Sequence, residues 1–142
     1  MINSSILVTP LKIINHKDGN ILHALKKNEE SFLDFGEAYF SWISQNSIKA
    51  WKKHTKMTMN LIVPIGSVKF VFKIVDRDNN AVFYEKEVGE DNYVRITVPP
   101  NIWFGFKCVS KKSSLILNVA SIPHDPNEVQ RMKISDIEYN WN

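Results

Sequence analysis

The sequence has few of the residues that mark the common catalytic and metal sites. Cys108 is the only cysteine, so the chain forms no internal disulfide, which fits a reducing compartment. The four histidines are widely spread and are never paired as H-x-H or H-x-x-x-H, which argues against a first-row metal site. A glycine-rich phosphate loop, a G-x-S-x-G elbow and a C-x-x-C pair are also absent. We therefore expect neither a metal nor a cofactor.

Long apolar runs and a strong charge of one sign are missing as well. The longest apolar stretches, such as 61–65, are far shorter than the roughly 20 residues of a membrane-spanning helix. The N-terminus lacks a basic region followed by a long apolar run, so we expect no secretory signal and a cytoplasmic location. The net charge is +3 and the basic residues are scattered, so we expect no nucleic-acid and no membrane partner. This charge is compatible with a mildly basic pocket that binds an anionic small molecule.

The composition that is present is typical of a folded globular protein. Hydrophobic residues make up 44% of the chain and charged residues 23%, which argues against disorder. We find no repeat and no linker, and 142 residues suit a single domain over 1–142 with a core of its own.

Short β runs separated by turn signals follow one another along the chain. In 68–75, Val68, Phe70, Phe72 and Ile74 alternate with other residues, which is the pattern of a strand with one buried face. About eight such strands and no strand–helix alternation predict a mainly β, antiparallel sandwich or barrel. A short helical turn is predicted over Asn127–Met132.

The segment 51–58 carries the first candidate for chemistry. If it continues into the strand that follows, then Lys52, His54 and Asn60 share a parity and face the interior of the barrel. A lysine and a histidine two residues apart would form a proton-transfer pair, with either neutral His54 or a Lys52 of lowered pKa as the base. The alternative interpretation is a basic surface turn.

Polar residues on other strands are the remaining candidates for an interior site. Glu37, Tyr39 and Arg95 are predicted to face inward. Asn118 interrupts the apolar run 115–119, and a buried amide needs hydrogen-bond partners. Its partner is predicted to be either the backbone or a hydroxyl of a ligand.

Four segments resemble the dTDP-4-dehydrorhamnose 3,5-epimerase family, whose members are small cupins of nucleotide-sugar biosynthesis. The segments occur along the chain in the same order as in that family. The segments are FGEAYF at 35–40, IKAWKKHTKMT at 48–58, VPPNIWFGF at 98–106, and LNVASIPHDP at 117–126, with a closing YNW at 139–141. The resemblance implies a cupin-type jelly-roll barrel (a double-stranded β-helix), a homodimer and no metal for epimerisation. It also implies a nucleoside-diphosphate sugar with a keto group as the ligand, and a role in lipopolysaccharide or surface-polysaccharide biosynthesis.

The function implied by the resemblance is that of an epimerase or ketoisomerase. Such an enzyme abstracts a proton next to the keto group of a nucleoside-diphosphate 4-keto-6-deoxy sugar. Lys52 and His54 are the predicted catalytic residues. The predicted substrate-binding residues are Glu37, Tyr39, Asn60, Arg95 and Asn118.

The sequence departs from the family pattern at the positions of proton transfer. Lys52 stands where the family has its catalytic histidine, Phe104 where a second histidine is usual, and Asn118 near the position of the general-acid tyrosine. His54 matches a second histidine of shorter relatives that read W-H-x-H. The alternative function is therefore a catalytically inactive cupin that binds a sugar nucleotide or a protein partner.

Overall fold

The computed structural model describes residues 6–142, and its regular structure is antiparallel β-sheet apart from one short 3₁₀ turn. The first sheet has the strand order β1-β9-β6-β11-β4, with the bounds Leu7–Pro10 (β1), Val94–Val98 (β9), Met59–Ile65 (β6), Ser114–Ala120 (β11) and Glu37–Ile43 (β4). The second sheet has the order β12-β5-β10-β7-β8, with the bounds Val129–Arg131 (β12), Ile48–His54 (β5), Trp103–Cys108 (β10), Ser67–Val75 (β7) and Ala81–Gly89 (β8).

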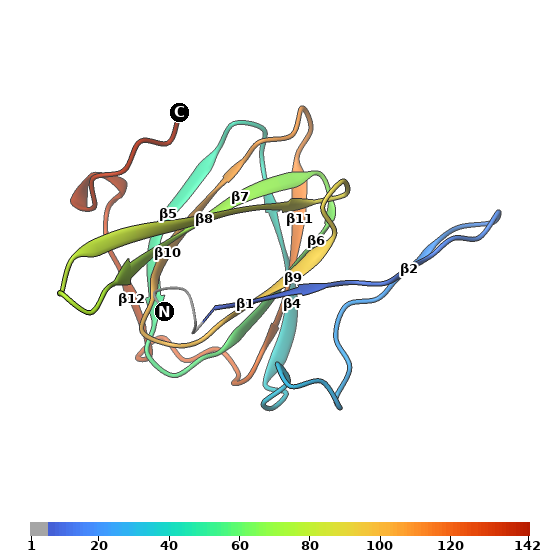
Figure 1. The fold of residues 1–142 in the computed structure, drawn as a ribbon, viewed down its shortest axis with the longest axis horizontal. Coiled ribbons are helices and arrows are strands. Elements are labelled where there is room, and N and C mark those ends of the chain that lie inside the picture. The colour runs from blue at the N-terminus through green and yellow to red at the C-terminus, as the bar shows by residue number, and fades with distance from the viewer. Residues whose placement is uncertain (1–5) are drawn as a thin grey trace.

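The two five-stranded sheets form two layers with the main core between them (Figure 1). Two short strands, β2 (Ile13–Ile14) and β3 (Ile21–Leu22), make a separate hairpin, and the 3₁₀ turn η1 spans Ile134–Asp136. This arrangement confirms the predicted mainly β, antiparallel jelly roll.

Alternation within the strands explains how the core forms. On β7, the predicted apolar face of Val68, Phe70, Phe72 and Ile74 packs into the core between the sheets. Residues of the first sheet, such as Ile96, meet it from the other side. Burying one such side chain stabilises the fold by about 1.5–3 kcal/mol.

The outer face of the first sheet is also covered, and two predicted interior residues lie there instead. Arg95 is fully buried and donates hydrogen bonds to Glu29 Oε2 (2.5 Å), Ser31 Oγ (2.6 Å) and the Ala24 carbonyl (2.6 Å). Asn60 donates to the Ser31 carbonyl at 3.2 Å. The prediction that Arg95 and Asn60 face the interior of the barrel is therefore wrong. Both side chains tie the segment before β4 to the sheet.

The C-terminal segment covers the outer face of the second sheet. Trp51, Val71, Ile137 and Trp141 form a second apolar cluster there. The Trp51 indole N–H donates to the Ile134 carbonyl at 3.2 Å. A Cβ at Gly105 would lie only 3.0 Å from the Trp141 ring and 2.6 Å from Ala50 Cβ, so the close approach of the C-terminal segment requires glycine there.

The segment over Asn127–Met132 is not the short helical turn that its sequence predicts. Residues 129–131 form strand β12, which pairs with the edge of β5 and sets Val129 opposite His54 and Arg131 opposite Lys52. The tertiary pairing with β5 outweighs the local helical preference. This strand brings residues of the C-terminal third of the chain to the predicted site.

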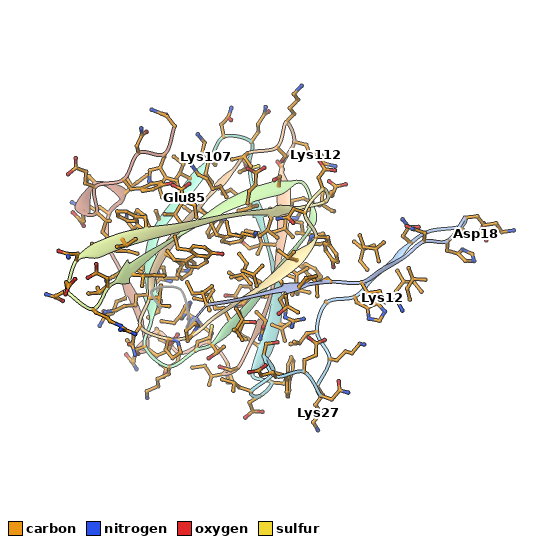
Figure 2. All side chains as sticks on the ribbon, in the orientation of Figure 1. Lys12, Asp18, Lys27, Glu85, Lys107 and Lys112 are labelled. Atoms are coloured by element: carbon orange, nitrogen blue, oxygen red, sulfur yellow. The ribbon has the colours of Figure 1, made fainter. Side chains whose placement is uncertain are left out.

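The β2–β3 hairpin projects from the two layers like an arm (Figure 1). Asp18 lies at its far tip and Lys12 nearer its base (Figure 2). Its four aliphatic side chains are all exposed by more than a third: Ile13, Ile14, Ile21 and Leu22. Among residues 6–142, β2 and β3 form a sheet of their own and pair only with each other. A two-stranded hairpin is only marginally stable on its own in water.

Among residues 6–142, no helix has the length and apolar character needed to cross a membrane.

A substitution of Arg95 tests its structural role. We expect Arg95→Met to lower the free energy of unfolding by about 3–5 kcal/mol, because it leaves Glu29 without its buried partner. Urea denaturation measures the change, and Arg77→Met in the exposed 76–80 turn serves as the control. A loss below about 1 kcal/mol would show that Arg95 does not hold the covering segment.

Candidate functional site

Three neighbouring cavities surround Lys52, and we call them together the Lys52 pocket. Their volumes are about 390, 330 and 70 Å³, and Lys52 lines all three. Other side chains line two of them each, namely Tyr39, Ser41, His54, Phe104, Phe106 and Arg131. The pocket lies between the inward faces of β4 and β11 of the first sheet and β5, β10 and β12 of the second.

A buried carboxylate holds the imidazole of His54 at one side of this pocket. His54 is 7% exposed, and its Nδ1 lies 2.5 Å from Oε1 of Glu128, which is 2% exposed. The other oxygen of Glu128 accepts hydrogen bonds from the backbone amides of residues 55–57, at 3.1, 3.1 and 3.2 Å. Because the turn after β5 wraps around the carboxylate, both the position and the ring orientation of His54 are set by Glu128.

The environment of Glu128 keeps it ionised. Burial alone would raise the pKa of its carboxyl group, but the hydrogen bonds from His54 and from the amides of Lys56 and Met57 outweigh that effect, so the pKa lies below its ordinary value. An ionised carboxylate only accepts hydrogen bonds, so Nδ1 of His54 carries the proton. In the neutral ring the lone pair is then on Nε2, which makes that atom available as a base.

Lys52 lies near two other cations, Arg131 and Lys49, and the charge of Glu128 offsets part of their repulsion. Burial, followed by the charges of Arg131 and Lys49, lowers the pKa of Lys52 below its ordinary value. Within residues 6–142, neither Lys52 nor Arg131 forms an ion pair. A pocket with two unpaired cations favours an anionic ligand.

The opposite wall of the pocket comes from the first sheet. Tyr39 and Asn118 are partners across β4 and β11, and the Asn118 amide donates to the Tyr39 hydroxyl at 3.0 Å. Glu37 lines the 390 Å³ cavity. On the second sheet, Phe104 of β10 lies beside His54 with its ring nearly parallel, at a centroid distance of 6.2 Å and an angle of 19°. It therefore supplies an apolar wall where the motif resemblance implies a histidine.

The structure brings five of the seven predicted site residues together around one pocket: Lys52, His54, Glu37, Tyr39 and Asn118. Three further lining or supporting residues, Glu128, Arg131 and His124, were not predicted. Glu128 lies 74 residues from His54, and only the pairing of β12 with β5 reveals its role. No local pattern in the sequence signals that contact.

Another cavity of about 600 Å³, larger than any one of these three, lies around the turn between β6 and β7 and the loops that follow β8 and β10. Two of its charged residues, Glu90 and Lys112, pair with each other at 2.8 Å, and no histidine lines it. We therefore assign the candidate site to the Lys52 pocket. Within residues 6–142, no three His, Cys, Asp or Glu side chains are arranged to hold a metal ion.

Comparisons with known proteins relate the chain to enzymes of sugar nucleotides. No family model matches the chain. A probable low-salt glycan biosynthesis epimerase, Agl13 of Haloferax volcanii, is 25% identical over 132 residues, which cover 89% of this chain and 84% of that protein.

Solved structures with the same fold include a dTDP sugar isomerase from Desulfovibrio desulfuricans G20. That structure has a TM-score of 0.90 and 29% identity, and the match covers 97% of this chain and 91% of that one. QdtA, a sugar 3,4-ketoisomerase from Thermoanaerobacterium thermosaccharolyticum in complex with TDP, has a TM-score of 0.76 and 22% identity over 91% and 89% of the two chains, a likeness of fold alone. These comparisons confirm the resemblance that the motifs indicate: the chain is similar in sequence and fold to a dTDP sugar isomerase, and it has the fold of the dTDP-4-dehydrorhamnose 3,5-epimerases.

Proposed function

We propose that this protein is a nucleotide-sugar-modifying enzyme, an epimerase or ketoisomerase of a nucleoside-diphosphate 4-keto-6-deoxy sugar. The observation that carries the proposal is the His54–Glu128 pair, buried at the wall of a pocket that also holds unpaired cations. The similarity to a dTDP sugar isomerase and to a glycan biosynthesis epimerase supports the same class of substrate.

His54 is the proposed base. Its Nε2 atom takes a proton from the carbon next to the ketone, and the imidazolium that forms is stabilised by the Glu128 carboxylate at Nδ1. The electron pair of the broken C–H bond forms a carbon–carbon double bond, and the ketone becomes an enolate oxygen. Lys52 as a cation stabilises that oxygen, and its partial burial strengthens the interaction.

The return of the proton decides the product. If the proton returns to the same carbon from the other face, that carbon is inverted and the reaction is an epimerisation. If it returns to the former keto carbon while the neighbouring hydroxyl loses its proton, the ketone moves by one carbon and the reaction is a ketoisomerisation. Both reactions share the first step, which needs one base and one stabilised enolate.

A second cation beside the base suits the diphosphate of the nucleotide. Arg131 lies directly across from Lys52 on the paired strands β12 and β5, and both side chains line the two larger cavities. Phosphate oxygens match the planar guanidinium of Arg131 in charge and in hydrogen bonding, while Lys52 serves the enolate oxygen. Glu37 and Tyr39, on the opposite wall, position the sugar or the nucleotide in this proposal.

A second candidate function is a catalytically inactive cupin that binds a sugar nucleotide or a protein partner. The observation that favours it is the replacement of the usual histidines and tyrosine by Lys52, Phe104 and Asn118. A protein of this kind would bind the ligand without breaking a C–H bond.

We further propose a homodimer in which the β2–β3 arm packs on a second copy. The arm exposes Ile14 and Ile21 as a cross-strand pair, at 37% and 57%. On the outer face of the edge strand β4, Phe40 and Trp42 are 63% and 57% exposed. Burying both surfaces against a second copy would remove them from water. We also propose a cytoplasmic location and a role in lipopolysaccharide or surface-polysaccharide biosynthesis.

Single substitutions at the base and at the enolate cation test the proposed reaction. We expect His54→Asn to lower kcat/KM for TDP-4-keto-6-deoxyglucose at least about 100-fold, because it removes the base. Lys52→Met should lower it at least about tenfold. NMR of the sugar nucleotide measures the conversion.

Lys53→Met is the matched control for these variants, because Lys53 lies over the Trp103 ring on the outer face of the same strand. Its kcat/KM should stay within about twofold of the wild type. Wild-type rates in both His54→Asn and Lys52→Met would rule out the assignment.

Charge on the arm tests the homodimer. We expect the double variant Ile14→Asp and Ile21→Asp to sediment as a monomer of 16.4 kDa, and the wild type as a dimer, because two carboxylates do not pack in an apolar interface. Asp18→Asn at the arm tip is the control and should remain dimeric. A monomeric wild type, or a double variant that stays dimeric, would exclude this interface.

A further inference from the structure

The inner wall of the Lys52 pocket contains a hydrogen-bonding group that the proposed proton transfer does not use. Asn118 is 2% exposed, and its side-chain nitrogen donates to the Tyr39 hydroxyl at 3.0 Å. Its side-chain oxygen is buried and has no hydrogen-bond partner within residues 6–142. Most buried polar atoms in proteins are paired, so this oxygen requires an explanation.

Tyr39 has a matching capacity that is also unused. Its hydroxyl oxygen accepts from Asn118, which leaves the phenolic proton free to donate to another group. Because the two residues are direct partners across β11 and β4, their side chains leave the sheet side by side on the same face. Together they present one acceptor and one donor to the pocket.

The small volume of the cavity beside Asn118 and Tyr39 limits the size of the group that they can bind. The smallest cavity of the pocket, about 70 Å³, is lined by Tyr39, Asn118, Lys52 and His54 together with apolar side chains such as Phe70. It has room for a group of a few atoms and not for a nucleotide. A ligand group in this cavity therefore lies next to the proposed base.

We infer that Asn118 and Tyr39 bind the hydroxyketone of the sugar, so that the Asn118 oxygen accepts from the hydroxyl beside the ketone and the Tyr39 hydroxyl donates to the keto oxygen. A ketone with a hydroxyl on the next carbon offers one acceptor and one donor, which complements this pair. Tyr39 is 39% exposed, and it lines the 70 Å³ cavity together with Asn118, so a small ligand group in that cavity would meet both side chains. The inference rests on the proposed function and makes Asn118 a specificity-determining residue.

The consequence is discrimination against a sugar that lacks the hydroxyl. Such a sugar would leave the buried oxygen of Asn118 unpaired, and a site built to hydrogen-bond a hydroxyl rejects the analogue without it. Since the hydroxyl meets an uncharged amide, we expect an affinity difference between about tenfold and hundredfold.

Calorimetric titration with three ligands tests the inference. The ligands are TDP, TDP-4-keto-6-deoxyglucose and the 3-deoxy analogue of that sugar nucleotide. The wild type should bind the hydroxylated sugar nucleotide at least about tenfold more tightly than the analogue. In Asn118→Leu the difference should fall below about threefold, while the Kd for TDP stays within about twofold of the wild type.

Two further variants make the outcome decisive. Asn118→Ala repeats the comparison with a smaller side chain if leucine lowers the melting temperature. Tyr39→Phe should weaken both sugar nucleotides by a similar factor, since both carry the keto oxygen, and should leave TDP unchanged. A wild type that binds both sugars equally, or an Asn118 variant that keeps the full discrimination, overturns the inference alone. A protein that binds neither sugar nucleotide overturns the proposed function with it.

Discussion

The buried carboxylate of Glu128 is the contact on which the candidate site depends. It accepts hydrogen bonds from His54 and from three consecutive backbone amides, so it fixes the end of β5 and the turn that follows. A carboxylate buried without such partners would be strongly unfavourable, and here several donors compensate its loss of hydration. Because Glu128 immediately precedes β12, the same residue holds the C-terminal strand against the edge of the second sheet.

The pocket forms because the two sheets of the jelly roll face each other at this arrangement. His54 and Lys52 leave the second sheet, and Tyr39 and Asn118 leave the first, so the pocket receives chemically different groups from opposite walls. Two of the residues that depart from the family pattern, Phe104 and Asn118, contact other residues of this pocket. Phe104 packs beside the imidazole that Glu128 orients, and Asn118, near which the motif resemblance implies a tyrosine, forms a pair with Tyr39.

Strand alternation in the sequence was sufficient to predict the β architecture. For Lys52 and His54 it offered the inward direction as one of two interpretations, the other being a basic surface turn. It failed at Asn60 and Arg95 for two separate physical reasons. The turn at 55–58 carries the chain from the second sheet to the first, so the parity of β5 does not continue into β6. On β9 all five residues are buried, because the segment before β4 covers the outer face of that sheet, so alternation does not tell which face meets the pocket.

The parts of the site that could not be predicted come from distant contacts. Glu128 and Arg131 reach the pocket through strand β12, whose three residues have no strand pattern of their own and pair only with the exposed edge of β5. Burial is the main reason that the pKa of Lys52 is lowered, and the charge of Arg131, which adds to this effect, is brought near Lys52 by that pairing. Motif resemblance located the pocket, and the pairing of β12 located its supporting residues.

The central claim is that His54, oriented by Glu128, removes a proton from the carbon beside the ketone. Incubation of TDP-4-keto-6-deoxyglucose with the protein in D₂O, followed by proton NMR and mass spectrometry, tests it whether or not a new sugar accumulates. The account predicts deuterium at a carbon adjacent to the ketone with the wild type, and at least about tenfold slower incorporation with Glu128→Gln. Binding of the sugar nucleotide with no incorporation above the rate without protein would contradict it.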